Sequence, residues 1–279
     1  MSFDRIPIFA SMNKSEILYK GLITLGKERT TEYFKNVELF ESQFKYGEIN
    51  HGCFKEMYET LEANDTYPAR QDFFEKIPYL EDECKKCYKY FMKPRNKSVK
   101  GLDVQLGKLL EEIFIEYFKT QSINIIRADL KNRRYPDLLI LDNSKEIIGY
   151  IELKYHAAPF LLTYRMRPGR ECYEGSLTLD KEKVAKQLKI IFSELDRPVF
   201  YVHWVDFPCM KGIFYQTSEQ LHEILLKGSD EIYRKTREGD FVERKDGTIK
   251  KVGFSEKFYP SLTEMGSFEE LIKTINNNK

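Results

Sequence analysis

The stretch from Leu138 to Tyr155 constrains the fold more than any other part of the chain, because it holds two apolar runs that flank a set of turn residues. The runs are LLIL and IIGYIELKY, and the segment between them is DNSKE. Apolar runs of this length, bounded by Asp, Asn and Ser, are typical of buried strands joined by a reverse turn. We therefore predict an antiparallel hairpin inside a sheet, with Glu152 and Lys154 on a strand whose neighbouring residues are apolar.

The patterns on either side of this hairpin predict an α/β fold, with a central mixed sheet flanked by helices. Apolar residues at helical spacing predict helices over residues 15–40, 101–120, 179–195 and 268–275, the third with Asp180 as its N-cap. Further strands are predicted over residues 123–128, 198–206 and 212–217. A polar, basic segment at 93–101 marks a candidate boundary, so we expect a helical N-terminal region over 1–100 and a second unit over 101–279.

Composition excludes several classes of protein. The net charge is only +1 although 32% of the residues are charged, so any polyanionic partner must be met by a local patch. Five Cys in 279 residues, at irregular spacing, fit reduced thiols better than a disulfide scaffold. The N-terminal residues show no signal-peptide pattern, and no apolar run approaches the roughly 20 residues that cross a bilayer. We expect a soluble, cytoplasmic protein that has no membrane partner.

Side-chain alternation in the predicted hairpin gathers polar groups on one face. If the loop has two residues, Asn143 and Ser144, then Asp137 falls opposite Tyr150 and shares a face with Glu152 and Lys154. A loop of four residues gives the same parity, whereas a loop of three would send Asp137 to the opposite face. The commonest hairpin geometry therefore brings two carboxylates and one ammonium together.

Such a cluster suits phosphodiester hydrolysis. Two carboxylates can hold Mg²⁺ or Mn²⁺, which prefer oxygen ligands. The metal polarises a phosphate and lowers the pKa of a bound water, and a neighbouring Lys can orient that water and offset transition-state charge. The alternative is a cross-strand ion pair on a solvated face, which would leave the apolar residues around the cluster unexplained.

The cluster resembles the signature of the PD-(D/E)XK nuclease superfamily, which has the restriction-endonuclease-like fold. Pro136-Asp137, fourteen residues and then Glu152-Leu153-Lys154 match the signature in order and context, within residues 101–205. The resemblance implies that Asp137 and Glu152 bind metal together with the Leu153 carbonyl. It also implies that Lys154 is catalytic.

Members of this superfamily often carry an acidic residue on the preceding helix, at a Gly-x-x-x-Glu spacing. Gly107 and Glu111 match that spacing; helical phase does not separate Glu111 from Glu112, so Glu111 is chosen on spacing alone. Some exonuclease-like members have a later Gln-x-x-x-Tyr. Here Gln187 is followed at that spacing by Ile191, which disfavours the exonuclease-like subgroup.

Basic residues gather near the predicted site. A loop at 164–175 holds Arg165, Arg167 and Arg170, whose planar donors suit guanine edges and phosphates. Lys183 and Lys186 follow on the next predicted helix, where they suit phosphate contacts that set register. The alternative for the loop is a solvated basic segment without a ligand.

The resemblance implies a type II restriction endonuclease that uses Mg²⁺ to cut double-stranded DNA at specific sequences. Such enzymes usually act as homodimers, and residues 1–100 are a candidate for the dimer interface or for DNA contact. Two other classes stay open, namely a structure-specific or repair nuclease with the same triad and a DNA-binding or assembly module without catalysis.

Two other features carry further expectations. Cys84 and Cys87 form a single CxxC pair, and a structural zinc site would need two more ligands such as His51 and Cys53. Most single pairs of this kind on a helix are incidental. His156 lies two residues after Lys154 and is expected either to support the site or to pack at the edge of the core.

Overall fold

The computed structural model describes residues 14–35, 102–128, 136–156, 177–206, 211–227, 231–233, 241–251, 253, 256–260 and 262–278. Within these residues the chain is α/β, with a central mixed sheet of six strands in the order β1-β2-β3-β5-β6-β11. Only β3 and β5 run parallel, and every other neighbouring pair is antiparallel. The strands are β1 Asn124–Arg127, β2 Leu138–Leu141, β3 Ile147–His156, β5 Val199–Asp206, β6 Lys211–Thr217 and β11 Gly266–Ser267.

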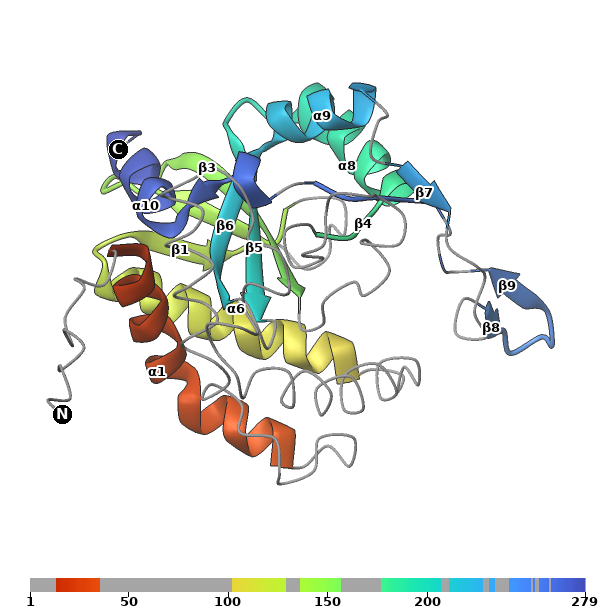
Figure 1. The fold of residues 1–279 in the computed structure, drawn as a ribbon, viewed down its shortest axis with the longest axis horizontal. Helices are drawn as coiled ribbons and strands as arrows, with labels where there is room; N and C mark the ends of the chain where they lie inside the picture. Colours follow the sequence, from red (N-terminus) through yellow and green to blue (C-terminus); the bar gives the residue numbers. More distant parts are fainter. Residues whose placement is uncertain are drawn as a thin grey trace, which may run out of the picture.

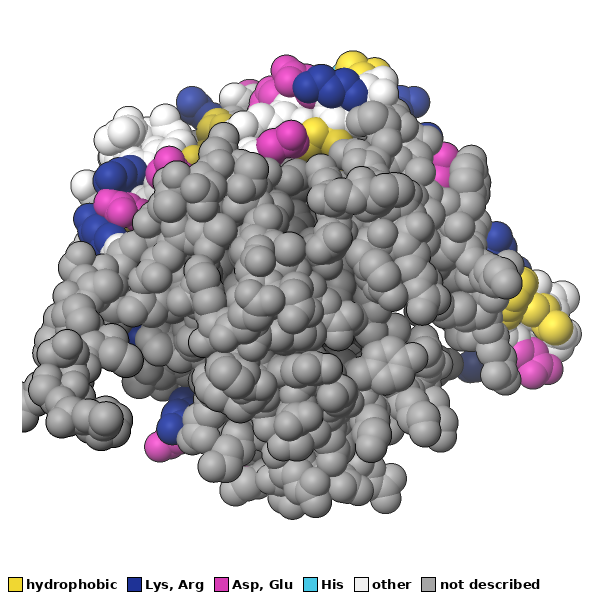
Figure 2. Space-filling view, viewed as in Figure 1, with side chains coloured by type: hydrophobic (Ala, Val, Ile, Leu, Met, Phe, Trp, Pro, Cys, Tyr) yellow, Lys and Arg dark blue, Asp and Glu magenta, His cyan; other side chains and the backbone are white. Residues whose placement is uncertain are grey.

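Helices cover both faces of this sheet (Figure 1). On one face lie α1 (Lys14–Lys35), α6 (Leu102–Thr120) and α10 (Phe268–Asn277), and on the other lie α8 (Lys181–Glu194) and α9 (Ser218–Lys227). The outward side of α9 carries charged side chains of both signs (Figure 2). None of the described helices is long and apolar enough to cross a membrane.

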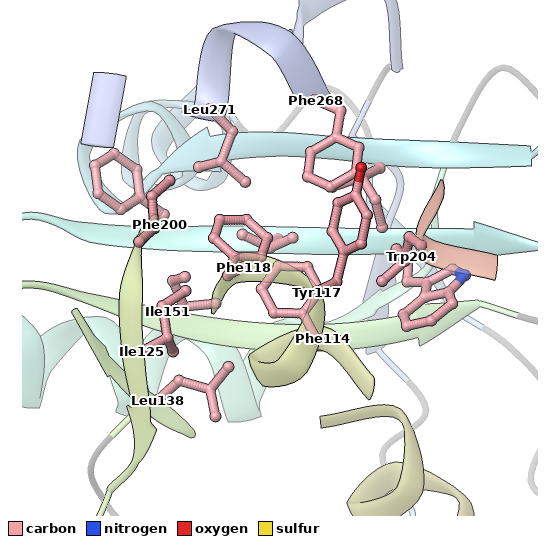
Figure 3. Packing of buried hydrophobic residues seen from close by; sticks show 14 of the residues in the cluster. Phe114, Tyr117, Phe118, Ile125, Leu138, Ile151, Phe200, Trp204, Phe268 and Leu271 are labelled. Carbon is pink, nitrogen blue, oxygen red and sulfur yellow. The ribbon is translucent and has the colours of Figure 1, made fainter. Parts of the chain in front are cut away.

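The core lies in two layers because side chains alternate along the central strands. Phe200, Val202 and Trp204 of β5 point into the larger layer, where they meet aromatic residues of α6 and Phe268 of α10 (Figure 3). Val199 and Tyr201 point into the smaller layer beneath α8. Every residue of β5 is buried, which explains why its sequence is mostly apolar on both faces rather than alternating.

Two glycines allow α1 to lie close against α6. A Cβ atom at Gly21 would lie 2.9 Å from the hydroxyl of Tyr117, and one at Gly26 would lie 2.7 Å from Cδ1 of Ile113. Arg29 of α1 also donates two hydrogen bonds, of 3.1 and 2.6 Å, to the Glu116 carboxylate. The helix α1 therefore packs into the same core as α6, α10 and the central sheet. The domain boundary expected at residues 93–101 lies outside the described residues.

Smaller elements follow the central sheet. A second sheet has the strand order β4-β10-β7, formed by β4 Leu179–Asp180, β10 Glu256–Phe258 and β7 Glu231–Tyr233. A separate two-stranded ribbon consists of β8 Phe241–Glu243 and β9 Ile249–Lys251, and a short 3-10 helix, η4, spans Leu262–Glu264. The sequence patterns did not predict α9, these short strands or η4.

Within the described residues, the predicted helices and strands of the central layers are confirmed, with one change at the start of α8. Residues 36–40 of the first predicted helix lie outside the described residues. Asp180 occupies the N-cap position as expected, but its side chain makes no capping hydrogen bond. The Asp180 carboxylate instead forms an ion pair with Lys257 of β10. A capping box is present at the N-terminus of α10. The Ser267 hydroxyl accepts a hydrogen bond from the backbone N–H of Glu270, and the Glu270 carboxylate accepts one from the backbone N–H of Ser267.

Candidate active site

The hairpin β2–β3 differs from the predicted one in its loop. Three residues, Asn143 to Lys145, lie between Asp142 and Glu146, and the backbone N–H of Asp142 donates to the Glu146 carbonyl at 3.0 Å. Asp142 Oδ1 also accepts from the N–H groups of Ser144 and Glu146, each at 2.8 Å. Lys145 has φ +68°, the left-handed conformation that closes a three-residue hairpin loop. The predicted loop of two or four residues was therefore wrong.

A loop of three residues alone would have turned Asp137 away from the polar face, but a bulge restores the parity. Leu141 pairs with Ile147 whereas Ile140 pairs with Gly149, so Ile148 is an extra residue in β3. Beyond the bulge, Leu138 pairs with Ile151. The next residue, Asp137, consequently stands across from Glu152 and not across from Tyr150 as predicted.

The structure brings the three predicted triad residues together at the start of β2. Oδ2 of Asp137 accepts a hydrogen bond of 2.9 Å from the backbone N–H of Leu153. The ammonium of Lys154 forms an ion pair with Oε1 of Glu152. Glu152 is 4% exposed, so its carboxylate is a buried charge that requires a partner.

The two carboxylates of this cluster are buried and repel each other. Burial raises the pKa of the Asp137 carboxyl from 3.8 to about 6, and repulsion from Glu152 adds to the rise. Burial on its own would lower the pKa of Lys154, but the charges of Glu152 and Asp137 outweigh burial, so this pKa lies above its ordinary value. Lys154 is therefore an ammonium at neutral pH, and the two carboxylates would be relieved by further positive charge.

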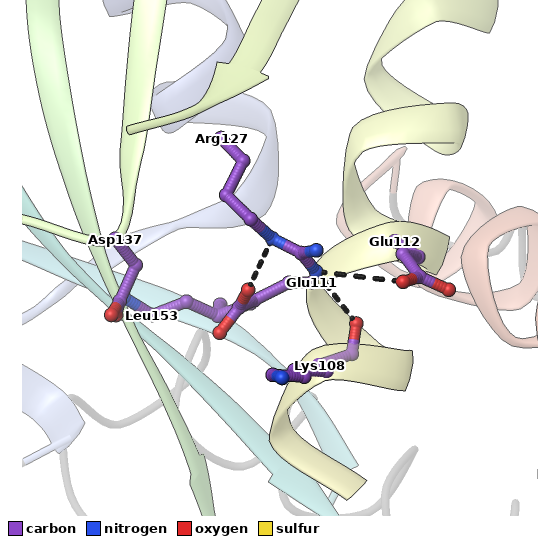
Figure 4. A network of polar contacts seen from close by, with 6 residues as sticks. All are labelled: Lys108, Glu111, Glu112, Arg127, Asp137 and Leu153. Carbon is purple, nitrogen blue, oxygen red and sulfur yellow. Dashed lines mark hydrogen bonds and ion pairs between the residues drawn. The ribbon is translucent and has the colours of Figure 1, made fainter. Parts of the chain in front are cut away.

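The position of Glu111 separates it from Glu112 (Figure 4). Oε2 of Glu111 accepts a hydrogen bond of 2.9 Å from Nε of Arg127 in β1, and its side chain is 19% exposed. Glu112 is 52% exposed and lies 3.7 Å from the same guanidinium. Burial raises the pKa of Glu111, Arg127 lowers it, and Glu152 raises it further, so Glu111 is the acid of α6 that acts on the triad. Its catalytic role stays a prediction.

The helix α8 brings one of its two predicted basic residues to the site. The ammonium of Lys154 lowers the pKa of Lys183, and burial lowers it further, so the two lysines are close enough to repel. Lys186 instead pairs with Glu182 on the solvent side of α8, where the side chain of Lys186 is 70% exposed.

Two residues next to the triad had no assigned role from the sequence. The hydroxyl of Tyr201 donates a 3.0 Å hydrogen bond to Oε1 of Gln187 in α8, and Tyr201 pairs with Glu152 across β5 and β3. Burial raises the pKa of Tyr201, and the charges of Glu152 and Asp137 raise it further, so the phenol stays a donor. The alternation of side-chain direction along β5 would have placed Tyr201 on the site face, once the parallel pairing with β3 was known.

A row of buried polar side chains continues from the triad along the same face. Nε2 of His156 lies 3.1 Å from Nδ1 of His203, and Nε2 of His203 lies 3.2 Å from Nε2 of Gln216. Burial lowers the pKa of His203 well below its ordinary value, and His156 and Lys154 lower it further. His203 is therefore neutral, and His156 is buried at the edge of the core, which is one of the two positions expected for it.

The remaining predicted residues are not placed. Arg165, Arg167 and Arg170 lie outside the described residues, as do Cys84 and Cys87 with their candidate partners His51 and Cys53. Within the described part of the chain, no three His, Cys, Asp or Glu side chains are arranged to hold a metal ion.

The donor set of the triad nevertheless fits Mg²⁺. Sites for this ion commonly use one or two carboxylates and are completed by waters and substrate oxygens. Asp137 and Glu152 are two such carboxylates, and burial, together with repulsion from Glu152, raises the pKa of Asp137. No protein-family model matches the chain, and no curated protein matches it. The chemistry of the site is therefore inferred from its residues and their geometry.

Proposed function

We propose that the chain is a Mg²⁺-dependent endonuclease of restriction-endonuclease-like fold that hydrolyses phosphodiester bonds of double-stranded DNA at specific sequences. The proposal rests chiefly on the Asp137–Glu152–Lys154 cluster, in which two mutually repelling carboxylates and an ammonium meet on one face of a buried hairpin. A cross-strand ion pair would need one carboxylate and would favour a solvated surface, whereas Glu152 is buried. A structural ion pair between Lys154 and Glu152 leaves the second carboxylate, Asp137, unexplained.

Each residue of the cluster has a role in this reaction. Asp137 and Glu152, with the carbonyl of Leu153, would hold Mg²⁺, which supplies Lewis-acid polarisation of the phosphate and a more acidic water. Lys154 orients the attacking water by hydrogen bonding and offsets the negative charge that develops on the phosphate. Its ion pair with Glu152 keeps the ammonium at the site before substrate binds.

Residues around the cluster support the same role. Arg127 holds the Glu111 carboxylate at 2.9 Å and so fixes the third acidic group beside the triad. Lys183, which repels Lys154, would gain a partner when a phosphate enters between them. The loop arginines Arg165, Arg167 and Arg170 would read bases, and a homodimer would cut both strands of a symmetric site.

Digestion of a sequenced plasmid tests the proposal. The purified protein is incubated with Mg²⁺ or Mn²⁺, with Ca²⁺, and with EDTA, and the ends of the products are mapped. We expect discrete ends in Mg²⁺ or Mn²⁺, little turnover in Ca²⁺ and none in EDTA. Asp137→Ala and Lys154→Ala should each lower the rate by about 100-fold or more, because each removes a group that acts in the transition state.

Glu112→Gln is the matched control, because Glu112 lies beside Glu111 but faces solvent. This variant should cut at the wild-type rate. Unchanged cleavage by Asp137→Ala, or full activity in EDTA, contradicts the mechanism. Cleavage of branched or single-stranded DNA in preference to the plasmid would instead identify a structure-specific nuclease with the same site.

A further inference from the structure

The ribbon β8–β9 is the most exposed element among the described residues. All eleven residues from Phe241 to Lys251 are exposed, and the ribbon projects from the body of the molecule on the side where β7 lies (Figure 1). An isolated two-stranded ribbon is marginally stable in water at best. Exposure on both faces therefore indicates that the ribbon serves a partner rather than the core.

The tip of the ribbon has a defined shape. The backbone N–H of Arg244 donates to the Thr248 carbonyl at 2.8 Å, and that of Gly247 donates to the Arg244 carbonyl at 2.9 Å. Gly247 has φ +79°, which a residue with a side chain adopts only at a cost. Asp246 accepts hydrogen bonds from the N–H and the hydroxyl of Thr248, at 3.0 and 2.6 Å. The tip is therefore held by its own hydrogen bonds.

The ribbon is cationic although the whole chain is nearly neutral. Between residues 241 and 251 four Lys and Arg stand against two acidic residues, which leaves +2, while the full chain carries +1. The cations are Arg244, Lys245, Lys250 and Lys251. One of the two acids, Asp246, is engaged in the turn. This local charge suits a polyanion.

Exposed apolar side chains lie beside charged ones on this ribbon, at the right edge of the molecule (Figure 2). Phe241, Val242 and Ile249 are 45%, 38% and 72% exposed. Phe241 pairs with Lys251 and Val242 with Lys250, so an apolar and a cationic group lie side by side on each face of the ribbon. The third pair, Glu243 with Ile249, shares the face of Phe241 and Lys251. Apolar groups can contact sugars and base edges while the cations contact phosphates. A second copy of the ribbon would instead bring like charges together.

The base of the ribbon is tied to the helix that faces the candidate active site. The ribbon lies in sequence between β7 and β10, which pair with each other, and β10 also pairs with β4. Two ion pairs join β10 to the start of α8, one between Lys257 and Asp180 and one of 2.8 Å between Glu256 and Lys181. Lys183, the lysine that repels Lys154, follows in the first turn of α8.

We propose that β8–β9 is a DNA-binding arm, which lies in a groove of the duplex that occupies the active site and contacts its phosphates through Arg244, Lys245, Lys250 and Lys251. The choice of DNA as the partner rests on the proposed nuclease function. The major groove of B-form DNA admits a two-stranded ribbon, and each phosphate contact steepens the salt dependence of binding.

The test measures binding of a fluorescent duplex in EDTA, where no cleavage occurs, so that it is independent of catalysis. The double variant Lys250→Ala/Lys251→Ala is compared with the wild type. Two lost phosphate contacts should reduce the slope of log affinity against log salt by about 1.8. From about 50 mM to about 200 mM salt, the wild-type affinity should then fall about 12-fold more than that of the variant.

A matched control separates the arm from overall charge. Lys119→Ala/Lys227→Ala removes the same charge from exposed positions at the ends of α6 and α9. This control should keep the wild-type slope, and thermal melting should show that both variants are folded. A control that loses as much slope as the ribbon variant overturns the proposal.

The remaining outcomes are also decisive. An unchanged slope for the ribbon variant, or no duplex binding by the wild type, overturns the arm, whatever the cleavage assay shows. Ribbon-dependent binding without cleavage in Mg²⁺ supports the arm and contradicts the nuclease activity. If Phe241→Ser/Ile249→Ser converts a dimer to a monomer and leaves DNA affinity unchanged, the ribbon is a subunit contact and the proposal fails.

Discussion

Replacement of Asp137 by Asn should stabilise the protein while it abolishes cleavage. In the native state burial and the neighbouring Glu152 raise the pKa of Asp137 from 3.8 to about 6. At about 1.36 kcal/mol per pKa unit, ionising this carboxyl in the folded state costs about 3 kcal/mol more than in the unfolded chain. Asn carries no charge, and its side-chain oxygen can still accept the hydrogen bond from the Leu153 N–H.

The sign of the pH dependence follows from the direction of the shift. Because the native carboxyl binds its proton more tightly than the unfolded one, the wild type loses stability as the pH rises from about 4 through about 6. We therefore expect Asp137→Asn to be more stable than the wild type by about 3 kcal/mol near pH 8, and by only about 1 kcal/mol near pH 4.5.

Urea denaturation in EDTA at the two pH values measures this difference in unfolding free energy. Glu112→Gln is the control and should show no comparable gain, because the Glu112 side chain is half exposed. Mg²⁺ should stabilise the wild type, by about 2.7 kcal/mol at 100 times its dissociation constant, and should stabilise Asp137→Asn far less. The reasoning is refuted if Asp137→Asn is no more stable than the wild type near pH 8, or if its gain is the same at both pH values.

Three further substitutions test the fold. Lys145→Gly should raise the unfolding free energy by up to about 1 kcal/mol, because Lys145 sits at φ +68°, and a lower urea midpoint would contradict this. Gly26→Val should lower the melting temperature through overpacking against Ile113, at a cost of about 1–3 kcal/mol, and an unchanged melting curve would show that α1 does not need this close approach. Tyr201→Phe should cost about 1 kcal/mol, measured by urea denaturation, because Gln187 loses its hydrogen-bond donor; no loss would mean that the bond is not stabilising.

The central elements could be predicted from the sequence because their signals are local. The apolar spacing in α6 and α8 and the apolar runs of β2, β3 and β5 reflect burial of one stripe or of a whole strand. Alternation also placed Glu152 and Lys154 on one face of β3. The same reasoning joined Asp137 to them, but through a loop length that was wrong. The structure reaches the same parity with a three-residue loop and an extra residue at Ile148.

Pairings between distant segments were decided by the tertiary structure. Helical phase left Glu111 and Glu112 equivalent, and only the packing of α6 against β1 brings Arg127 to Glu111. Tyr201 became part of the site because β5 lies parallel to β3 and because Gln187 faces it from α8. Periodicity reports which side of an element is buried, whereas these contacts depend on the register and packing of elements that lie far apart in the chain. The sequence therefore determined the elements and the polar face, and the packing of α6, α8 and β5 around that face determined which side chains meet there.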